Sequence, residues 1–197
     1  MNSKLTILQQ KIDFIIEVDK LKNVLRQSVI TQSQRRENSA EHSWHLAILL
    51  ITLQDYSPKP IDLLKCLKIA LIHDIVEIDS GDVYAFDTDG RLEKQAHEER
   101  AAKRLFAMLP QELGSELHKL WLEYEEQKTT EARFVKIMDR IQPLLLNYLS
   151  QGHTWKKHSV SYQRVLEINQ AWAKDAPELF EYIKKLLEEC RENEYFI

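Results

Sequence analysis

Three ionisable residues, His73, Asp74 and Glu77, interrupt an apolar stretch that runs from Leu67 to Gly81. The apolar residues of this stretch recur at helical spacing, which predicts a largely buried helix that ends at Gly81. On such a helix Glu77 lies four residues after His73 and three after Asp74, so the three side chains share one region of its surface. Burying ionisable groups is costly unless they are paired or bound to a metal ion. This stretch is therefore the first candidate for a chemical site.

Two further ionisable residues lie on other apolar helices predicted from the sequence. His42 follows a cap sequence at 38–41, and Asp139 lies within the apolar run 135–141. Each has an ordinary interpretation, because a buried histidine can find a partner in the core and Asp139 can pair with Arg140. Alternatively, one divalent cation satisfies all four groups, with two imidazoles and two carboxylates. That mixed set of nitrogen and oxygen ligands suits manganese, cobalt, nickel, iron or zinc.

The rest of the chain reads as helical, with only 4 Gly and 5 Pro among its 197 residues. We predict one all-α domain over residues 1–197, a bundle of seven or eight helices. The segments expected, in order, are a helix from Leu5 to about Leu25, a loop from Arg26 to Asn38, a helix from Ser39, the helix ending at Gly81, an ordered loop over 79–90, and helices over 91–109, 111–127, 130–148, 160–174 and 177–190.

Composition excludes several classes of function. The net charge of −4 argues against nucleic acid as the main partner, since phosphate binding needs a basic surface. The two cysteines give neither a disulfide framework nor a metal-ligand spacing. The chain lacks an apolar run long enough to span a membrane and lacks a secretion-signal pattern at its start. A cytoplasmic protein that does not bind membranes is the expectation.

The order His42, then His73-Asp74, then Asp139 resembles the H…HD…D signature of the HD superfamily of metal-dependent phosphohydrolases. The sequences around these residues strengthen the resemblance. They are Glu-Asn-Ser-Ala-Glu-His-Ser-Trp at 37–44, His-Asp-x-x-Glu-x-x-x-Gly-Asp at 73–82 and Lys-x-x-Asp-Arg at 136–140. Together they are similar, over nearly the whole chain, to the small single-domain HD proteins that act as 5′-deoxynucleotidases.

The resemblance implies a role for each residue of the motifs. It implies one divalent metal ion with four ligands: His42, His73, Asp74 and Asp139. Glu77 would orient or deprotonate the attacking water, Asp82 would contact the sugar hydroxyl, and Arg26 would bind the substrate phosphate. An aromatic residue often follows this arginine in the family, whereas this chain has Gln27. From the residues alone, Glu77 can also be a helix-end carboxylate and Asp82 a turn residue.

The implied reaction is hydrolysis of a (deoxy)nucleoside 5′-monophosphate to nucleoside and phosphate by a metal-bound water. Two alternatives stay open. One is hydrolysis of another nucleotide, such as a cyclic nucleotide, a guanosine polyphosphate alarmone or a nucleoside triphosphate. The other is a metal-stabilised module that binds a nucleotide or a protein without turnover. A homodimer is also expected, from the resemblance and from aromatic residues in the last third that exceed what a small bundle must bury: Trp155, Tyr162, Trp172 and Phe180.

Overall fold

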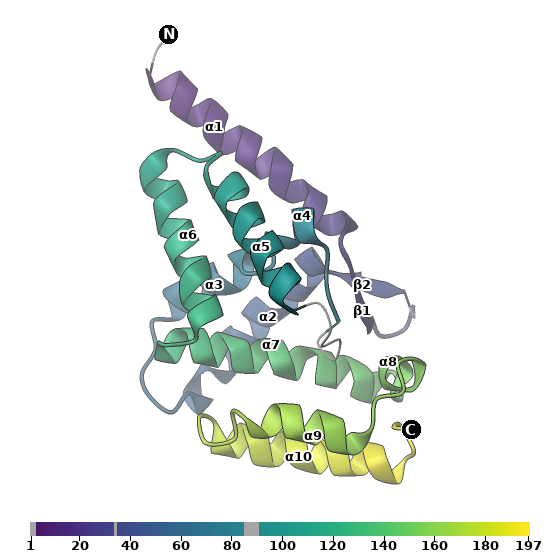
Figure 1. Ribbon diagram of the computed structural model, residues 1–197. Coiled ribbons are helices and arrows are strands. Elements are labelled where there is room, and N and C mark those ends of the chain that lie inside the picture. Colours follow the sequence, from purple (N-terminus) through teal and green to yellow (C-terminus); the bar gives the residue numbers. More distant parts are fainter. Residues whose placement is uncertain (1–2, 34, 85–90) are drawn as a thin grey trace.

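The computed structural model describes residues 3–33, 35–84 and 91–197, and most of them lie in α-helices (Figure 1). Within these ranges eight α-helices have nine or more residues and two are shorter, beside two 3-10 helices and one two-stranded sheet. The all-α class predicted from the sequence is therefore confirmed. In chain order the elements are α1 (Ser3–Val18), η1 (a 3-10 helix, Asp19–Asn23), β1 (Leu25–Val29), β2 (Arg36–Asn38), α2 (Ser39–Leu53), η2 (Gln54–Tyr56), α3 (Leu63–Ile72), α4 (Glu77–Ser80), α5 (Arg91–Phe106), α6 (Gln111–Glu126), α7 (Thr130–Leu149), α8 (His153–Lys157), α9 (Tyr162–Gln170) and α10 (Pro177–Glu192).

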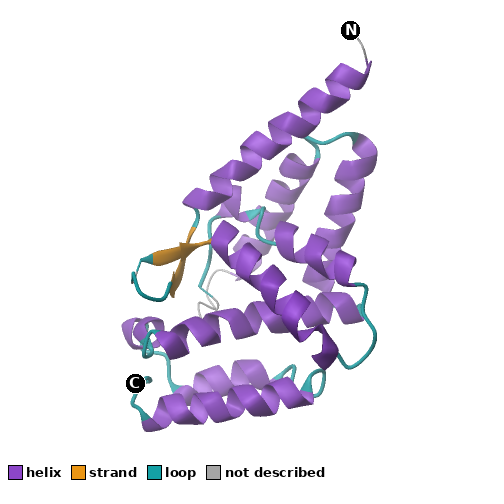
Figure 2. Cartoon of the chain, turned by 180° about the vertical axis from the view of Figure 1, so that it is seen from behind, coloured by secondary structure: helices purple, strands orange, loops and turns teal. Residues whose placement is uncertain are grey.

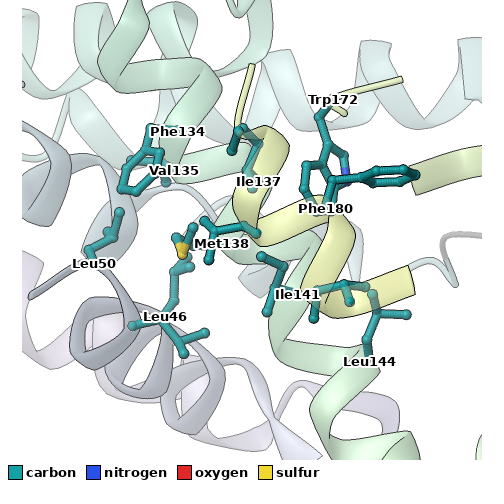
Figure 3. Close-up of a cluster of buried hydrophobic side chains, with 14 of the residues drawn as sticks. Leu46, Leu50, Phe134, Val135, Ile137, Met138, Ile141, Leu144, Trp172 and Phe180 are labelled. Carbon is teal, nitrogen blue, oxygen red and sulfur yellow. The ribbon is translucent and has the colours of Figure 1, made fainter. Parts of the chain in front are cut away.

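The main hydrophobic core surrounds α7, which runs between the pair α2 and α3 and the pair α9 and α10 (Figure 1). Leu46 and Leu50 of α2 lie beside Met138 of α7, while Trp172 and Phe180 lie at its other side (Figure 3). Burying each large apolar side chain of this kind contributes roughly 1.5–3 kcal/mol. Because α7 is packed on two sides, the polar residues in its middle are held in fixed positions.

A second, smaller core fixes the segment that follows α3. Ile75 and Val76 pack there with Leu105 of α5, Trp121 of α6 and Leu21 of η1. All five side chains are at most 3% exposed. The segment therefore cannot shift without opening contacts to three other elements.

The strands β1 and β2 form a β-hairpin, so the loop predicted from Arg26 to Asn38 is wrong at the residues of these strands. The strands β1 and β2 pair antiparallel, and the hairpin stands beside the helices (Figure 2). The side chain of Arg36 donates hydrogen bonds to the backbone carbonyls of Leu25 and Arg26 across the hairpin. The segment is polar and has no alternation of apolar residues, so the usual strand signal is missing. Its strands are stabilised by contacts that sequence spacing does not reveal.

The single helix predicted over 67–81 is also interrupted. Helix α3 ends at Ile72 and α4 begins at Glu77, and between them the backbone makes tighter, three-residue hydrogen bonds, such as that from the Glu77 N–H to the Asp74 carbonyl. The apolar side chains of this turn pack into the second core, which favours the tighter path over a regular helix. Of the ordered loop predicted over 79–90, residues 85–90 lie outside the described residues.

The first helix ends at Val18, earlier than expected, and its exposed side is apolar. Helix α1 extends beyond the other helices (Figures 1 and 2). Its exposed apolar side chains are Leu5, Ile7, Leu8, Ile12, Ile15 and Ile16.

Three of the four aromatic residues named as candidates for self-association, Trp155, Trp172 and Phe180, are buried in the main core. The argument that they are free for self-association is therefore wrong. In the described part of the chain, we find no helix with the length and hydropathy that crossing a membrane requires.

Candidate metal centre

Three of the four predicted metal ligands converge from three different helices. His42 lies in the first turns of α2, His73 caps the carboxyl end of α3, and Asp139 lies in the middle of α7. One ligand atom from each lies within 4.8 Å of the others. His42 Nε2 is 3.0 Å from Asp139 Oδ1, and His73 Nε2 is 4.0 Å from the same oxygen. The structure therefore brings together residues that are distant in the sequence.

The fourth predicted ligand, Asp74, lies at the edge of this cluster. Its Oδ1 is 3.1 Å from His73 Nε2 and its Oδ2 is 3.9 Å from His42 Nε2. Its Oδ2 also accepts a hydrogen bond of 2.7 Å from Arg26, which reaches in from β1. The carboxylate thus faces both imidazoles on one side and a guanidinium on the other.

The hydrogen bonds behind the two imidazoles determine which ring nitrogen faces the cluster. His73 Nδ1 lies 2.8 Å from the backbone carbonyl of Ala70, which can only accept, so Nδ1 carries the proton. His42 Nδ1 lies 3.0 Å from Oε1 of Gln142, another acceptor. In a neutral ring the other nitrogen, Nε2, then carries a lone pair. Both Nε2 atoms point toward the carboxylates.

In this geometry the lone pairs of the two imidazole nitrogens face carboxylate oxygens, so hydrogen-bond acceptors face one another in a buried site. His42 Nε2 faces Asp139 Oδ1 at 3.0 Å, and His73 Nε2 is buried without a hydrogen-bond partner among the described residues. Such an arrangement is unfavourable unless a proton or a cation lies between the acceptors. Two imidazole nitrogens and two carboxylates are a suitable donor set for a divalent transition metal. The residues present therefore fit a metal ion.

A cavity of about 320 Å³ opens beside the cluster, a volume within the range of small-molecule sites. Six of the seven predicted site residues line it, and the seventh, His42, is fully buried behind Asp139. Besides these charged residues, apolar side chains line the cavity, among them Leu144, Trp155 and Ile168. This mixed lining is suited to a ligand that carries both an anionic and an apolar group.

Glu77 lines the cavity one residue into α4 and is only 5% exposed. The hydroxyl of Ser39, the first residue of α2, donates a hydrogen bond of 2.7 Å to its Oε2. Burial, together with the negative charge of Asp74, raises the pKa of Glu77 well above its ordinary value. A carboxylate with a raised pKa near a ligand cavity is a typical proton acceptor.

Asp139 has the opposite electrostatic character. Although burial alone would raise the pKa of Asp139, the positive charge of Lys136 holds it well below its ordinary value. Its Oδ2 accepts hydrogen bonds from Tyr124 at 2.7 Å and from Lys136 at 3.0 Å. These bonds leave Oδ1 facing the imidazoles, so the carboxylate is ionised and oriented.

Arg26 supplies the positive charge on the hairpin side of the cavity. Its Nη1 lies 2.7 Å from Asp74 and 3.8 Å from Asp82, and its Nη2 lies 4.0 Å from Asp139. Burial opposes the charged form of a guanidinium, yet the nearby carboxylates Asp74 and Asp82 raise the pKa of Arg26. Arg26 is therefore a permanent cation at the wall of the site.

Several residues at the site were given no role from the sequence. Glu37 and Ser39 stood within a quoted motif, but nothing in the motif shows that one contacts Gln142 and the other Glu77. Gln142 lies three residues after Asp139, so helical spacing offered a signal for it. Tyr124 gave no sequence signal, because its contact with Asp139 depends on how α6 packs against α7.

Residues 18–180 match the HD domain family, and the chain therefore belongs to that family. Membership of this family implies a divalent metal, and His42, His73 and Asp139 form a cluster able to hold one.

Named relatives and a solved structure are also similar to this chain. The 5′-deoxynucleotidase HDDC2 of Bos taurus is 35% identical over 68% of this chain, and that of Homo sapiens is 33% identical over 68%. The matched region spans 64% and 65% of these relatives, less than two thirds of their length. The crystal structure of a predicted metal-dependent phosphohydrolase from Magnetospirillum magnetotacticum has a TM-score of 0.91 and 39% identity, and the match covers 96% of this chain and 95% of that chain.

Proposed function

We propose that this chain is a divalent-metal-dependent phosphomonoesterase that hydrolyses nucleoside 5′-monophosphates, with deoxyribonucleotides as the expected substrates, to nucleoside and phosphate. The observation that carries the proposal is the set of buried acceptors, His42 Nε2, His73 Nε2 and the carboxylates of Asp74 and Asp139, beside a cavity. The names of the HDDC2 relatives support the choice of substrate.

The proposed metal ligands are His42, His73, Asp74 and Asp139, and the proposed cofactor is one divalent transition metal ion: manganese, cobalt, nickel, iron or zinc. When bound, such an ion supplies a Lewis acid that lowers the pKa of water and polarises a phosphoryl oxygen. The protein contributes the orientation of the ligands. Tyr124 and Lys136 hold Oδ2 of Asp139, so that Oδ1 stays directed at the imidazoles.

Glu77 is proposed to orient the attacking water and to accept its proton. Its raised pKa makes the carboxylate a stronger base than an ordinary glutamate, and Ser39 holds one of its oxygens in place. The other oxygen is then available to the water. The reaction needs no covalent nucleophile, because the water oxygen bonds to phosphorus as the bond from phosphorus to the 5′-oxygen breaks. The water gives a proton to Glu77, and the leaving 5′-oxygen takes up a proton to become the nucleoside hydroxyl.

Arg26 and Asp82 are proposed to bind the substrate. The Arg26 guanidinium lies between the carboxylates Asp74 and Asp82 and offers charge and N–H donors for phosphate oxygens. Asp82 is proposed to accept a hydrogen bond from the sugar hydroxyl. The apolar side chains that line the cavity, such as Leu144 and Trp155, are proposed to contact the base.

A phosphate-release assay across deoxy- and ribonucleoside monophosphates, cyclic nucleotides, guanosine polyphosphates and nucleoside triphosphates tests the proposal. The protein is assayed after chelation and after reloading with manganese or cobalt. Highest kcat/KM for deoxyribonucleoside 5′-monophosphates is the expected result. A preference for a diester or a polyphosphate contradicts the proposed substrate, and a lack of turnover with all of them, despite bound metal, favours the non-catalytic module.

Three further proposals concern the whole molecule. We propose that residues 1–197 form one HD-type domain, in line with the match over residues 18–180. We propose a homodimer, for which the exposed apolar side of α1 offers contact surface, and sedimentation at several concentrations tests it. The cytoplasmic location stays a prediction.

A further inference from the structure

Three buried polar side chains form a connected path that leads away from the candidate metal centre. Gln142 of α7 lies between Glu37 of β2 and His42 of α2, and the three are 0%, 2% and 0% exposed, respectively. Gln142 Nε2 donates a hydrogen bond of 2.7 Å to Oε1 of Glu37, and Gln142 Oε1 lies 3.0 Å from His42 Nδ1. The path thus runs from a carboxylate through an amide to an imidazole.

The path has one preferred direction. In the structure the nitrogen of the Gln142 amide faces Glu37 and its oxygen faces His42. A carboxylate at position 37 favours this orientation, because in its ionised form it only accepts hydrogen bonds. An amide oxygen that faces His42 requires a proton on His42 Nδ1, which leaves the lone pair on Nε2, directed at Asp139. The carboxylate therefore controls the tautomer of a ring with which it makes no hydrogen bond, since its own Oε2 is 3.8 Å from His42 Nδ1.

A second contact supports the same orientation of the amide. His45 Nδ1 lies 3.2 Å from Gln142 Nε2. The amide nitrogen carries two hydrogens, so it can donate to Glu37 and to His45 at once. Burial lowers the pKa of His45, as does the nearby His42, which favours the neutral ring that can accept such a bond. Reversing the amide would lose both bonds.

The other imidazole of the cluster is held differently. His73 Nδ1 contacts the carbonyl of Ala70 within its own helix, a local contact that any histidine at that position can make. His42 depends on residues from two other elements, the hairpin and α7. The hairpin, which the sequence did not predict, therefore contributes to the site, because β2 places Glu37 beside Gln142.

We infer that Glu37 and Gln142 are positioning residues that fix the Nδ1-protonated tautomer of His42, so that Nε2 is presented as a metal ligand. The inference rests on the metal-dependent function proposed above. It assigns both residues an effect on metal affinity, without contact with the metal or the substrate. Outer residues of this kind typically contribute about 10- to 100-fold in metal affinity.

The test compares manganese binding to four proteins by calorimetry, starting from metal-free samples. Gln142→Met removes both the acceptor and the donor, and about 10- to 100-fold weaker binding is expected. Glu37→Gln leaves an amide facing an amide, which has no preferred direction, so weaker binding is again expected. The double exchange Glu37→Gln with Gln142→Glu restores a donor at 37 and an acceptor toward His42, and most of the lost affinity should return.

Controls separate positioning from a loss of structure. Ser43→Ala alters a buried neighbour of His42 whose hydroxyl has no hydrogen-bond partner among the described residues, so its manganese affinity should equal that of the unaltered protein. Thermal unfolding of each metal-free variant reports folding. The ¹⁵N shifts of the His42 ring, measured without metal, report the tautomer directly and should show mixed tautomers in Glu37→Gln.

Native-like manganese affinity in Gln142→Met or Glu37→Gln overturns the inference. So does a double exchange that binds no better than Glu37→Gln, or a ring tautomer that is unchanged in that variant. If the unaltered protein binds no manganese or cobalt, the proposed function fails instead, and the ring shifts still decide whether Glu37 sets the tautomer. If Gln142→Met does not fold, the comparison of Glu37→Gln with the double exchange gives the answer.

Discussion

Arg26 and Asp74 form an ion pair of 2.7 Å between the hairpin and the end of α3, at a point where the site carries several buried carboxylates. The Arg26 side chain is 14% exposed and that of Asp74 is 12% exposed. Removing one partner of a buried pair leaves the other charge uncompensated. Arg26 and a bound divalent cation neutralise the same group of carboxylates, so the effect of one depends on the presence of the other.

We therefore predict that Arg26→Ala destabilises the metal-free protein by about 3–5 kcal/mol, the usual cost of breaking a buried pair. Saturating manganese should raise the unfolding temperature of this variant more than that of the unaltered protein. Arg26→Lys keeps the charge and serves as the matched control. Equal manganese-induced shifts in Arg26→Ala and the unaltered protein would contradict the shared role.

Replacing Glu77 by Gln should remove the proton acceptor while keeping the shape of the side chain. General base catalysis contributes about 100- to 10,000-fold, so kcat should fall by that factor. Metal content, measured by elemental analysis, should remain close to that of the unaltered protein, because Glu77 is not among the proposed ligands. Undiminished turnover in Glu77→Gln would remove this residue from the chemistry.

Ser39→Ala should show what the hydrogen bond to Glu77 contributes. A hydrogen bond to a charged group is worth about 1.5–3 kcal/mol, so we expect kcat to fall by about tenfold or more. KM should change little, since Ser39 does not line the cavity. Ser39→Thr, which keeps the hydroxyl, should recover activity. Equal activity of the Ala and Thr variants would show that the hydroxyl has no part in placing Glu77.

The stability of the metal-free protein should depend on pH through Glu77. Its pKa in the folded state lies above the ordinary 4.5, so the folded chain holds this proton more tightly than the unfolded chain. The contribution of this proton to the free energy of unfolding is therefore complete below pH 4.5, and it is lost as the pH rises through the pKa of Glu77 in the folded state. Urea unfolding with chelator present should show the unaltered protein losing stability relative to Glu77→Gln as the pH rises.

Asp139 should make the stability of the metal-free protein depend on pH in the opposite direction, which provides a check on the assignment to Glu77. Its folded pKa lies below the ordinary 3.8, so its contribution is present above that value and is lost as the pH falls through the folded pKa. Asp139→Asn should therefore flatten the acid side of the stability profile, whereas Glu77→Gln flattens the side above pH 4.5. A difference between the unaltered protein and Glu77→Gln that stays constant with pH would contradict the raised pKa.

Much of the helical framework can be predicted from the sequence, because its signals are local. Asn38 and Glu41 form the expected capping box at the start of α2, and Pro177 begins α10. The hairpin and the break after Ile72 could not be predicted. Both depend on contacts between distant residues, such as Arg36 with the carbonyl of Arg26, which compete with local preference.

In the candidate site too, some residues have a local sequence signal and others are placed only by contacts between distant residues. The sequence singled out His42, His73, Asp74 and Asp139 because each is an ionisable residue in an apolar segment, and the structure places them together. Gln142 and Tyr124 are ordinary residues by type, and only packing places them against His42 and Asp139. The residues that hold the ligands in place are therefore harder to recognise from sequence than the ligands themselves.

The central claim is that one divalent cation binds between α2, α3 and α7, and anomalous diffraction from manganese-loaded crystals tests it most directly. We predict one strong peak at about 2.0–2.2 Å from Nε2 of both His42 and His73 and from a carboxylate oxygen of both Asp74 and Asp139. The peak should be absent from crystals of Asp139→Asn grown in the same way. Manganese bound elsewhere, or an active enzyme whose crystals show no peak at this position, would contradict the account.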